Sequence, residues 1–372
     1  MQQVIIDFGE ITLFGRSVGV RIYGYGLMLV LGFLLGIYLA RWRARRFGED
    51  EDAVTTLGLL ALVAGVVGSR LAFVIERWDS QFAWHKHPLP EILNITSGGL
   101  IYYGGAALAL VSIVAYLRLR RLPIRRYLDI IAPTLMIGLA FGRMGCLLNG
   151  CCYGARCSAD YLLGMRFPYA AEPLLRYGKA PNFFGGAAPS PAFHSQAATL
   201  PEEMLGEIGV RSWLFQKGWD GNVQRNDRGE RAVKMPSELT PAQARQAAAL
   251  RSLPVQPAQA FGAVNALLIA GVLLAFSRLR RREGQVFALT LVLYPITRFV
   301  LESLRGDNLH AVLQLKLTHN QYSSLALLLA GLLIWFVLWR MPAEAGPSWR
   351  ERLAAAETRK PAPARQRKGS KS

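Results

Sequence analysis

The sequence predicts an all-α polytopic membrane protein, with about seven transmembrane helices around a cavity at outer-leaflet level and a small extracytoplasmic insert. Three observations carry this prediction. Of the 372 residues, 52% are hydrophobic and only 18% are charged. The apolar residues gather in runs of about 20, the length that a helix needs to cross roughly 30 Å of hydrocarbon. The basic residues lie in clusters between these runs, an arrangement typical of cytoplasmic loops.

Seven apolar runs have spanning length. They cover residues 19–40, 54–76, 99–117, 128–147, 259–277, 285–304 and 321–340. Residues 1–18 lack the basic start and the continuous apolar core of a cleavable signal peptide. Because apolar and polar residues alternate there, we expect a short amphipathic or strand-like segment at the membrane surface.

Basic residues predict the orientation. Residues 41–46, 118–126 and 277–282 hold four, five and four arginines, and the chain from Arg340 onward holds nine lysines and arginines. The alternate short loops, 77–97 and 305–319, hold two basic residues each. Since cytoplasmic loops carry the excess of lysine and arginine, the N-terminus is expected outside and the C-terminus in the cytoplasm.

Two further segments lie outside the runs. Residues 155–258, between helices one to four (19–154) and five to seven (259–340), form an extracytoplasmic insert with a short helix candidate, TPAQARQAAALRSL. Residues 341–372 are rich in Ala, Pro, Arg and Lys and are expected to be disordered near anionic lipid. We interpret the net charge of +18 as serving membrane orientation and contact with anionic lipid headgroups. No basic face with base-reading residues is evident, so a nucleic-acid partner is not expected.

Polar residues collect at one end of the runs. With this orientation, the runs place these residues in or near their outer halves: Tyr23, Tyr25, Arg70, Tyr103, Arg143, Asn149, Gln259, Arg298, Glu302, Arg305, Asn320 and Gln321. An arginine at membrane depth is costly, so it needs an anionic or dipolar partner unless it snorkels to the headgroups. Asp129, at the inner end of the fourth run, is the exception, and we expect it to start a helix.

Arg298, Glu302 and Arg305 have i, i+4, i+7 spacing, which puts them on one helix face. One interpretation is an internal ion pair between Arg298 and Glu302. The other is a basic pocket of Arg70, Arg143 and Arg298 that grips a lipid phosphate, since arginine can bind phosphate through two parallel hydrogen bonds. The two are compatible, because a carboxylate can hold an arginine in place for a ligand.

Glycines are frequent beside these polar residues. Gly98, Gly99, Gly104 and Gly105 flank Tyr103. Small residues allow helices to approach closely, and paired glycines also permit a broken or re-entrant backbone that lines a cavity. Both interpretations predict a tightly built cavity.

Several motifs occur together in the order seen in one known family. They are Tyr25-Gly-Leu-Met28, Gly98-Gly-Leu-Ile-Tyr-Tyr-Gly-Gly105, Gly142-Arg-Met-Gly145 with Asn149-Gly150 and Gly154, Pro257-Ala-Gln259, and Arg298-Phe-Val-Leu-Glu302. From about residue 12 to 340, apart from most of 160–250, the sequence resembles the prolipoprotein diacylglyceryl transferases.

The resemblance implies the first step of bacterial lipoprotein maturation. Family members transfer the sn-1,2-diacylglyceryl group of phosphatidylglycerol to the lipobox cysteine thiol of a prolipoprotein and release glycerol 1-phosphate. They are multi-pass proteins of the inner membrane with the site on the periplasmic side. The expected partners are therefore phosphatidylglycerol, prolipoprotein signal peptides with a lipobox cysteine, and the lipid bilayer, and no cofactor is expected.

The resemblance also implies roles for single residues. Arg143 looks like the arginine that holds the headgroup, Arg298 with Glu302 looks like the second essential arginine and its acidic neighbour, and Tyr25 matches the first-helix tyrosine. Tyr103 stands where many members have a catalytic histidine, so we expect it to accept or relay the thiol proton. The remaining expected contacts to phosphatidylglycerol are Arg70, Asn149, Gly154 and Gln259.

Four cysteines, Cys146, Cys151, Cys152 and Cys157, crowd into twelve residues with the spacing C-x4-C-C-x4-C. This is not the usual zinc spacing. A disulfide, buried thiols, a metal site and a catalytic thiol remain alternatives, and no metal site is assigned from the sequence. At Cys146 and Cys151 many family members have Asn and Glu, so the polar contacts expected there are missing.

Two other functions compete with the transferase. A transporter or channel also holds charges between helices, but it should show polar residues on both sides of the midplane and often an internal repeat. The polar residues here are one-sided, and no repeat is evident. A non-catalytic lipid-binding or assembly factor is the third alternative, which a lipidation assay separates from the transferase.

Overall fold

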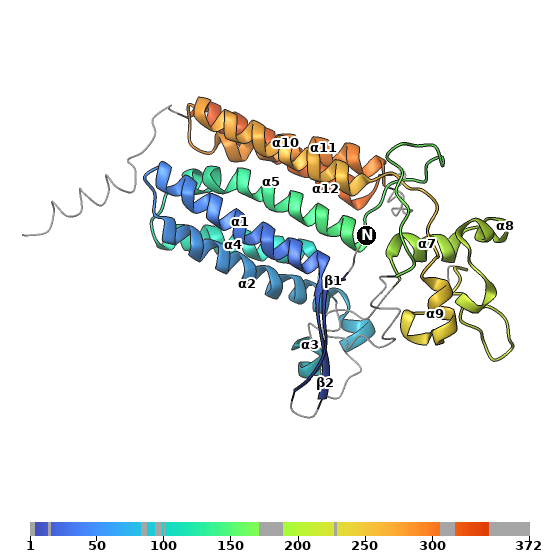
Figure 1. Ribbon diagram of the computed structural model, residues 1–372. Helices are drawn as coiled ribbons and strands as arrows, with labels where there is room; N and C mark the ends of the chain where they lie inside the picture. Colours follow the sequence, from blue (N-terminus) through green and yellow to red (C-terminus); the bar gives the residue numbers. More distant parts are fainter. Residues whose placement is uncertain are drawn as a thin grey trace, which may run out of the picture.

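The computed structural model describes residues 4–13, 16–82, 88–93, 99, 101–170, 189–226, 229–305 and 317–341. Its long helices, which run back and forth along one direction (Figure 1), are α1 (Gly24–Arg46), α2 (Glu51–Glu76), α4 (Tyr102–Leu119), α5 (Ile124–Asn149), α10 (Ala258–Leu279), α11 (Gln285–Ser303) and α12 (His319–Arg340). Six of them are long and apolar enough to cross a membrane, and most of α4 is a shorter apolar helix. This confirms the predicted all-α, multi-pass architecture.

The N-terminal segment is an antiparallel hairpin, as its alternating sequence indicated. Strands β1 (Val4–Leu13) and β2 (Arg16–Tyr23) pair from Val4 opposite Tyr23 to Leu13 opposite Arg16. The alternating RSVGVRIY of β2 keeps the chain extended up to Tyr23. For this reason α1 begins at Gly24 rather than at residue 19, where the apolar run begins.

α5 lies between two groups of helices. It packs against α1 on one side and α10 on the other, while α2 pairs with α4 and α11 pairs with α12. The α2–α4 contact depends on glycine, because a Cβ on Gly104 would lie 2.5 Å from the Gly68 carbonyl oxygen and 2.3 Å from the Ala72 Cβ. A Cβ on Gly105 would lie 2.5 Å from the Gly65 carbonyl oxygen. The α4 glycines therefore serve close packing, within a helix that is continuous from Tyr102.

Replacing Gly104 by alanine is expected to destabilise the protein by about 1–3 kcal/mol, because the new methyl group forces α2 and α4 apart. SDS-induced unfolding in mixed micelles measures this loss. Gly271→Ala in α10 is the matched control, since a Cβ there meets nothing within 4 Å. Equal stability of the two variants would contradict the close-packing role.

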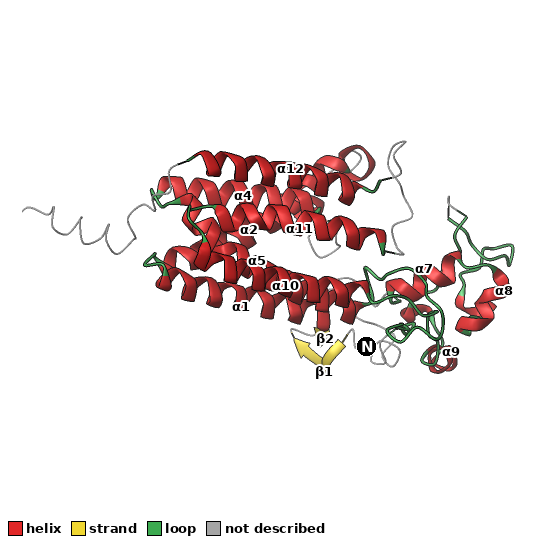
Figure 2. Cartoon of the chain, turned by 90° about the horizontal axis from the view of Figure 1, so that it is seen from above, coloured by secondary structure: helices red, strands yellow, loops and turns green. Residues whose placement is uncertain are grey.

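The insert between α5 and α10 has a hydrophobic core of its own. Its helices are α7 (Pro191–Thr199), α8 (Glu202–Leu205) and α9 (Pro241–Ala247), joined by short turns and isolated β-bridges. Tyr169, Phe193 and Leu214 are fully buried in this core. α9 lies within the predicted helix segment and begins with a capping box of Thr240 and Gln243. The insert lies beyond the ends of the long helices, at the same end as the hairpin (Figures 1 and 2).

Smaller elements follow α2, namely a single π-turn (Trp78–Phe82) and α3 (Pro88–Leu93). The predicted tail from residue 342 onward and most of the loop 305–319 lie outside the described residues.

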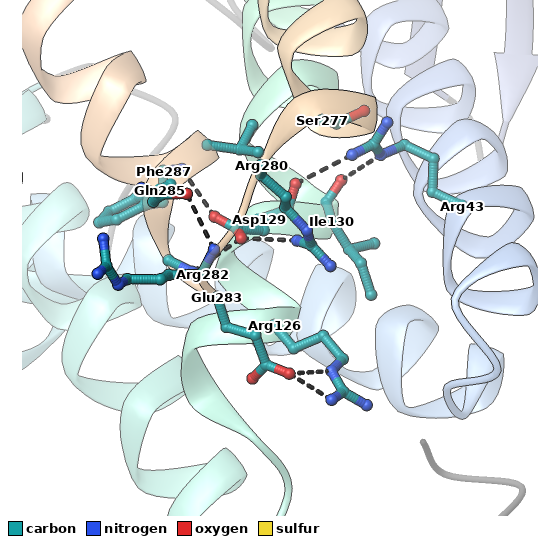
Figure 3. A network of polar contacts seen from close by, with 12 residues as sticks. Arg43, Arg126, Asp129, Ile130, Ser277, Arg280, Arg282, Glu283, Gln285 and Phe287 are labelled. Carbon is teal, nitrogen blue, oxygen red and sulfur yellow. Dashed lines mark hydrogen bonds and ion pairs between the residues drawn. The ribbon is translucent and has the colours of Figure 1, made fainter. Parts of the chain in front are cut away.

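The opposite end of the bundle holds a buried polar network (Figure 3). Arg126 bridges Glu49, at 2.7 Å, and Glu283. Asp129 is fully buried and accepts hydrogen bonds from the backbone N–H groups of Gly284 (2.8 Å) and Phe287 (2.9 Å) and from Arg280 (2.6 Å).

The position of Asp129 corrects the expectation that it starts its own helix. α5 begins at Ile124, directly after Pro123 and five residues before Asp129, so Asp129 lies inside the helix and not at its start. Gly284 is the N-cap position of α11, so the Asp129 carboxylate satisfies the free N–H groups at the start of a different helix. It caps α11 across the bundle.

Candidate functional site

The polar residues predicted for the site lie at one end of the bundle. Because neighbouring helices run in opposite directions, this end is built from the starts of α1, α4, α10 and α12 and the final turns of α2, α5 and α11. The insert and the hairpin are at the same end (Figure 1).

Arg143 is half-buried in the last two turns of α5. Its side chain packs over Gly262 of α10, where a Cβ would lie 3.2 Å from the Arg143 Cδ and 3.5 Å from its Nε. Among the described residues, the guanidinium has no hydrogen bond or ion pair to the protein. Tyr25 of α1 lies within electrostatic range of Arg143 and is 40% exposed, and a Cβ on Gly145 would lie 3.0 Å from its ring. The glycine of α10 thus leaves room for the Arg143 side chain.

Glu302 is the centre of a second cluster. Its carboxylate, fully buried, contacts Arg298 on the same helix at 2.5 Å and Arg305, two residues beyond the end of α11, at 3.6 Å, so both arginines meet Glu302 as their spacing indicated. Asn320 of α12 donates from its Nδ2 to Glu302 at 2.8 Å. The hydroxyl of Tyr103 in turn donates to the Asn320 Oδ1 at 2.9 Å. A continuous chain of hydrogen bonds therefore joins Tyr103 to Glu302.

Arg70 has contacts of a different kind. Its guanidinium donates to the backbone carbonyls of Ile92 (2.9 Å), Glu91 (2.5 Å) and Gly99 (3.1 Å). It also lies 5.2 Å from the centre of the Phe73 ring. These contacts favour a role in holding Glu91, Ile92 and Gly99 against α2 over the predicted contact to a lipid phosphate.

Gly154 and Gln259 hold the segment that follows α5. A Cβ on Gly154 would lie 2.7 Å from the carbonyl oxygen of Gln256, and the Gly154 N–H donates to that oxygen at 2.9 Å. Gln259 is fully buried, and its Nε2 donates to the Cys151 carbonyl at 2.8 Å. Both residues therefore position the loop that leaves α5, and their contacts favour this role over direct contact with a lipid. Asn149, the last residue of α5, is half-buried beside Cys151.

The sequence profile described as prolipoprotein diacylglyceryl transferase matches residues 13–337, which is most of the chain. The chain belongs to the prolipoprotein diacylglyceryl transferase family. Three similar proteins bear the name phosphatidylglycerol–prolipoprotein diacylglyceryl transferase. The one from Rhodopirellula baltica is 28% identical, over 89% of this chain and 75% of its own length. The one from Clostridium tetani is 24% identical, over 85% of this chain and 93% of its own length. The one from Bdellovibrio bacteriovorus is 26% identical, over 93% of this chain and 97% of its own length.

This member of the transferase family brings three cysteines together at the site. The Sγ atoms of Cys146, Cys151 and Cys152 all lie within 4.8 Å of one another, while Cys157 is not part of the group. All four are half-buried and free. Hydrogen bonds from the thiols of Cys146 and Cys151 lower the pKa of Cys152, and the nearby Arg305 and Arg143 act in the same direction. Arg305 thus lies between the cysteine group and the Glu302 cluster.

Asn320 and Arg305 were not among the site residues predicted from the sequence. Asn320 stands next to a helix start, where an amide is common, and nothing in the sequence pairs it with Glu302. Arg305 follows the i, i+3 pattern from Glu302, which was visible, but its position near Cys152 depends on the contact between 304–305 and 154–155. Only the folded chain shows that contact.

Proposed function

We propose that this protein transfers the sn-1,2-diacylglyceryl group of phosphatidylglycerol to the lipobox cysteine of prolipoproteins, the first step of lipoprotein maturation. The family and the names of its relatives support the reaction class. The observation that carries the proposal for this chain is Arg143. It is a half-buried guanidinium at one end of a membrane bundle, with no hydrogen-bond or ion-pair partner in the described protein.

Arg143 and Arg298 bind the phosphate of the lipid headgroup in this proposal. The substrate thiolate attacks the glycerol C3 carbon, a C–S bond forms, and the C–O bond to phosphate breaks. The electron pair leaves with the phosphate oxygen as glycerol 1-phosphate. Guanidinium groups stabilise the charge that develops there, which is usually the largest contribution to catalysis at such sites. Glu302 holds Arg298 in position, since it is paired with that arginine within the membrane bundle.

Tyr103 relays the thiol proton: its hydroxyl oxygen accepts that proton as its own phenolic proton passes to water, while Asn320, held by Glu302, keeps the hydroxyl in position. The hydrogen-bond chain of 2.9 and 2.8 Å supports this role, and the tyrosine is 52% exposed, so a substrate can reach it. Tyr25, also partly exposed, lies beside Arg143 and helps to orient the headgroup.

Tyr103→Phe is expected to lower the rate of transfer by about 100-fold, the lower end of the range for a positioned acid–base group. Tyr103→His should retain most of the activity, because imidazole also accepts a proton. The rate is measured with a lipobox peptide and phosphatidylglycerol in vesicles. Unchanged turnover in Tyr103→Phe would rule out the relay.

An apolar cavity supports binding of a lipid tail. Its volume is about 340 Å³, and it lies between α1, α2, α4 and α5. The lining runs along α1 from Leu29 to Ala40, a rise of about 16 Å at 1.5 Å per residue. We assign it to one acyl chain of the phospholipid.

The polar end faces the periplasm in this proposal, and the protein lies in the bacterial inner membrane. Basic residues in the last turns of α1, α4, α10 and α12 support it, because all these turns lie at the end opposite to the site. The N-terminus is then periplasmic and the C-terminus cytoplasmic.

The deciding experiment is a lipidation assay. The full-length protein is placed in vesicles with phosphatidylglycerol and a peptide carrying a lipobox cysteine, and the product is identified by mass spectrometry. A diacylglyceryl thioether and released glycerol 1-phosphate are expected. A peptide with serine in place of cysteine is the control. Absence of the thioether would favour a lipid-binding factor without catalysis.

A further inference from the structure

Three cysteines form a ready-made ligand set outside the contacts described for the phosphate. Their sulfur atoms lie within 4.8 Å of one another, although the sequence spacing is unlike that of common zinc motifs. A tetrahedral Zn²⁺ with Zn–S bonds of about 2.3 Å holds its sulfurs about 3.8 Å apart. Shifts of an ångström in three side chains therefore complete the geometry.

The backbone explains how residues with this spacing meet. Cys146 is in the last turn of α5, and the helix ends at Gly150, whose φ is 75°. This left-handed turn brings the Cys151 N–H back to the Cys146 carbonyl at 3.2 Å. Cys152 then adopts φ 57°, a left-handed conformation that is uncommon for a residue with a side chain. The chain is held in this conformation by the contacts of Gly154 and Gln259 to its neighbours.

The site can carry the charge of a metal with one open position. Three thiolates and one Zn²⁺ carry a net charge of −1, and the substrate thiolate as a fourth ligand makes it −2. Arg143 and Arg305 both lie within electrostatic range of Cys152 and offset this charge. Zinc sites with three protein ligands are typical of catalysis, with water or substrate in the fourth position. A thiol bound to zinc is deprotonated.

We propose that Cys146, Cys151 and Cys152 bind one zinc ion and that its fourth ligand is the thiolate of the incoming substrate. This inference rests on the proposed function for the identity of that thiol. The substrate S–H bond breaks on coordination, its proton leaves to Tyr103 or to water, and the sulfur keeps the electron pair. The zinc-bound sulfur then forms the bond to the glycerol carbon while the phosphate leaves with the electron pair of the broken C–O bond.

The test begins with metal content. Full-length protein in detergent micelles is analysed for zinc by elemental mass spectrometry, together with Cys146→Ser, Cys151→Ser and Cys152→Ser. We expect about one zinc per chain in the wild type and roughly tenfold or greater loss in each variant, as for removal of a group that supports a metal site. Cys157→Ser is the matched control and should keep its zinc, since Cys157 is outside the group.

A second measurement uses only the wild type, so it does not depend on the folding of the variants. The protein is stripped with a chelator and loaded with Co²⁺, whose absorption reports thiolate ligation and tetrahedral geometry. Without phosphatidylglycerol, a lipobox peptide with cysteine should change the spectrum, and the serine peptide should not. Indifference to both peptides would overturn the role of the substrate thiol.

The remaining outcomes are also decisive. Zinc content that is zero, or equal in all variants, overturns the site, as does a disulfide within the group, seen as an intact mass lower by two hydrogens. Transfer that persists unchanged after complete metal removal overturns this inference and leaves the proposed function standing. A zinc site in a protein without transfer activity overturns the proposed function instead.

Discussion

Arg143→Ala is expected to reduce the rate of diacylglyceryl transfer by about 100- to 1,000-fold, the cost of removing one preorganised charge-stabilising donor. The guanidinium is half-buried and makes no hydrogen bond or ion pair to a described residue, so in the proposed function its loss removes a contact to the phosphate and no such bond within the described protein. Stability should therefore stay close to that of the wild type. The vesicle lipidation assay, run at saturating phosphatidylglycerol, measures the effect.

Arg211→Ala is the matched control for this experiment. Arg211 is an exposed arginine of the insert, so its replacement removes the same charge without touching the proposed phosphate contacts. Its transfer rate should remain near the wild-type rate. Arg143→Lys should recover only part of the activity, because an ammonium cannot make the two parallel hydrogen bonds of a guanidinium. Full activity in Arg143→Ala would remove this residue from the proposed site.

Much of the architecture was predictable because apolar length is a local property. A run of about 20 apolar residues specifies a spanning helix almost independently of the rest of the chain. The polar end was predictable for the same reason, since alternating helix directions turn sequence position into depth. The start of α1 was misplaced because Val18, Val20 and Ile22 are apolar in a strand as well as in a helix.

Partner choice was less predictable, because it depends on contacts between distant segments. Arg70 lies at the expected depth, yet its donors meet the carbonyls of residues 91, 92 and 99. Gln259 lies at the expected helix start, yet it is buried against Cys151. The hydrogen bond from Asn320 to Glu302 joins α12 to α11, and nothing in the sequence marks the two residues as partners. Hydrophobic pattern and charge predict the depth of a residue in the membrane, whereas packing decides which groups its side chain contacts.

The sulfur group illustrates the same limit. Sequence spacing argued against a common zinc motif, because such motifs assume that ligands sit on short, regular turns. Here that turn is replaced by the end of a helix followed by Gly150 and Cys152, both of which have a left-handed backbone conformation. The spacing of the ligands is therefore specific to this loop.

Asp129→Ala is expected to destabilise the protein by about 3–5 kcal/mol, the cost of removing one partner from a buried ion pair. The carboxylate is fully buried and serves three donors, Arg280 and the N–H groups of Gly284 and Phe287, so its removal leaves a buried cation and an uncapped helix. SDS-induced unfolding measures the loss. Asp52→Ala at the same end is the control. Its carboxylate is 85% exposed and 3.4 Å from Arg41, so a change within about 0.5 kcal/mol is expected. Similar stability of the two variants would show that the start of α11 does not depend on Asp129.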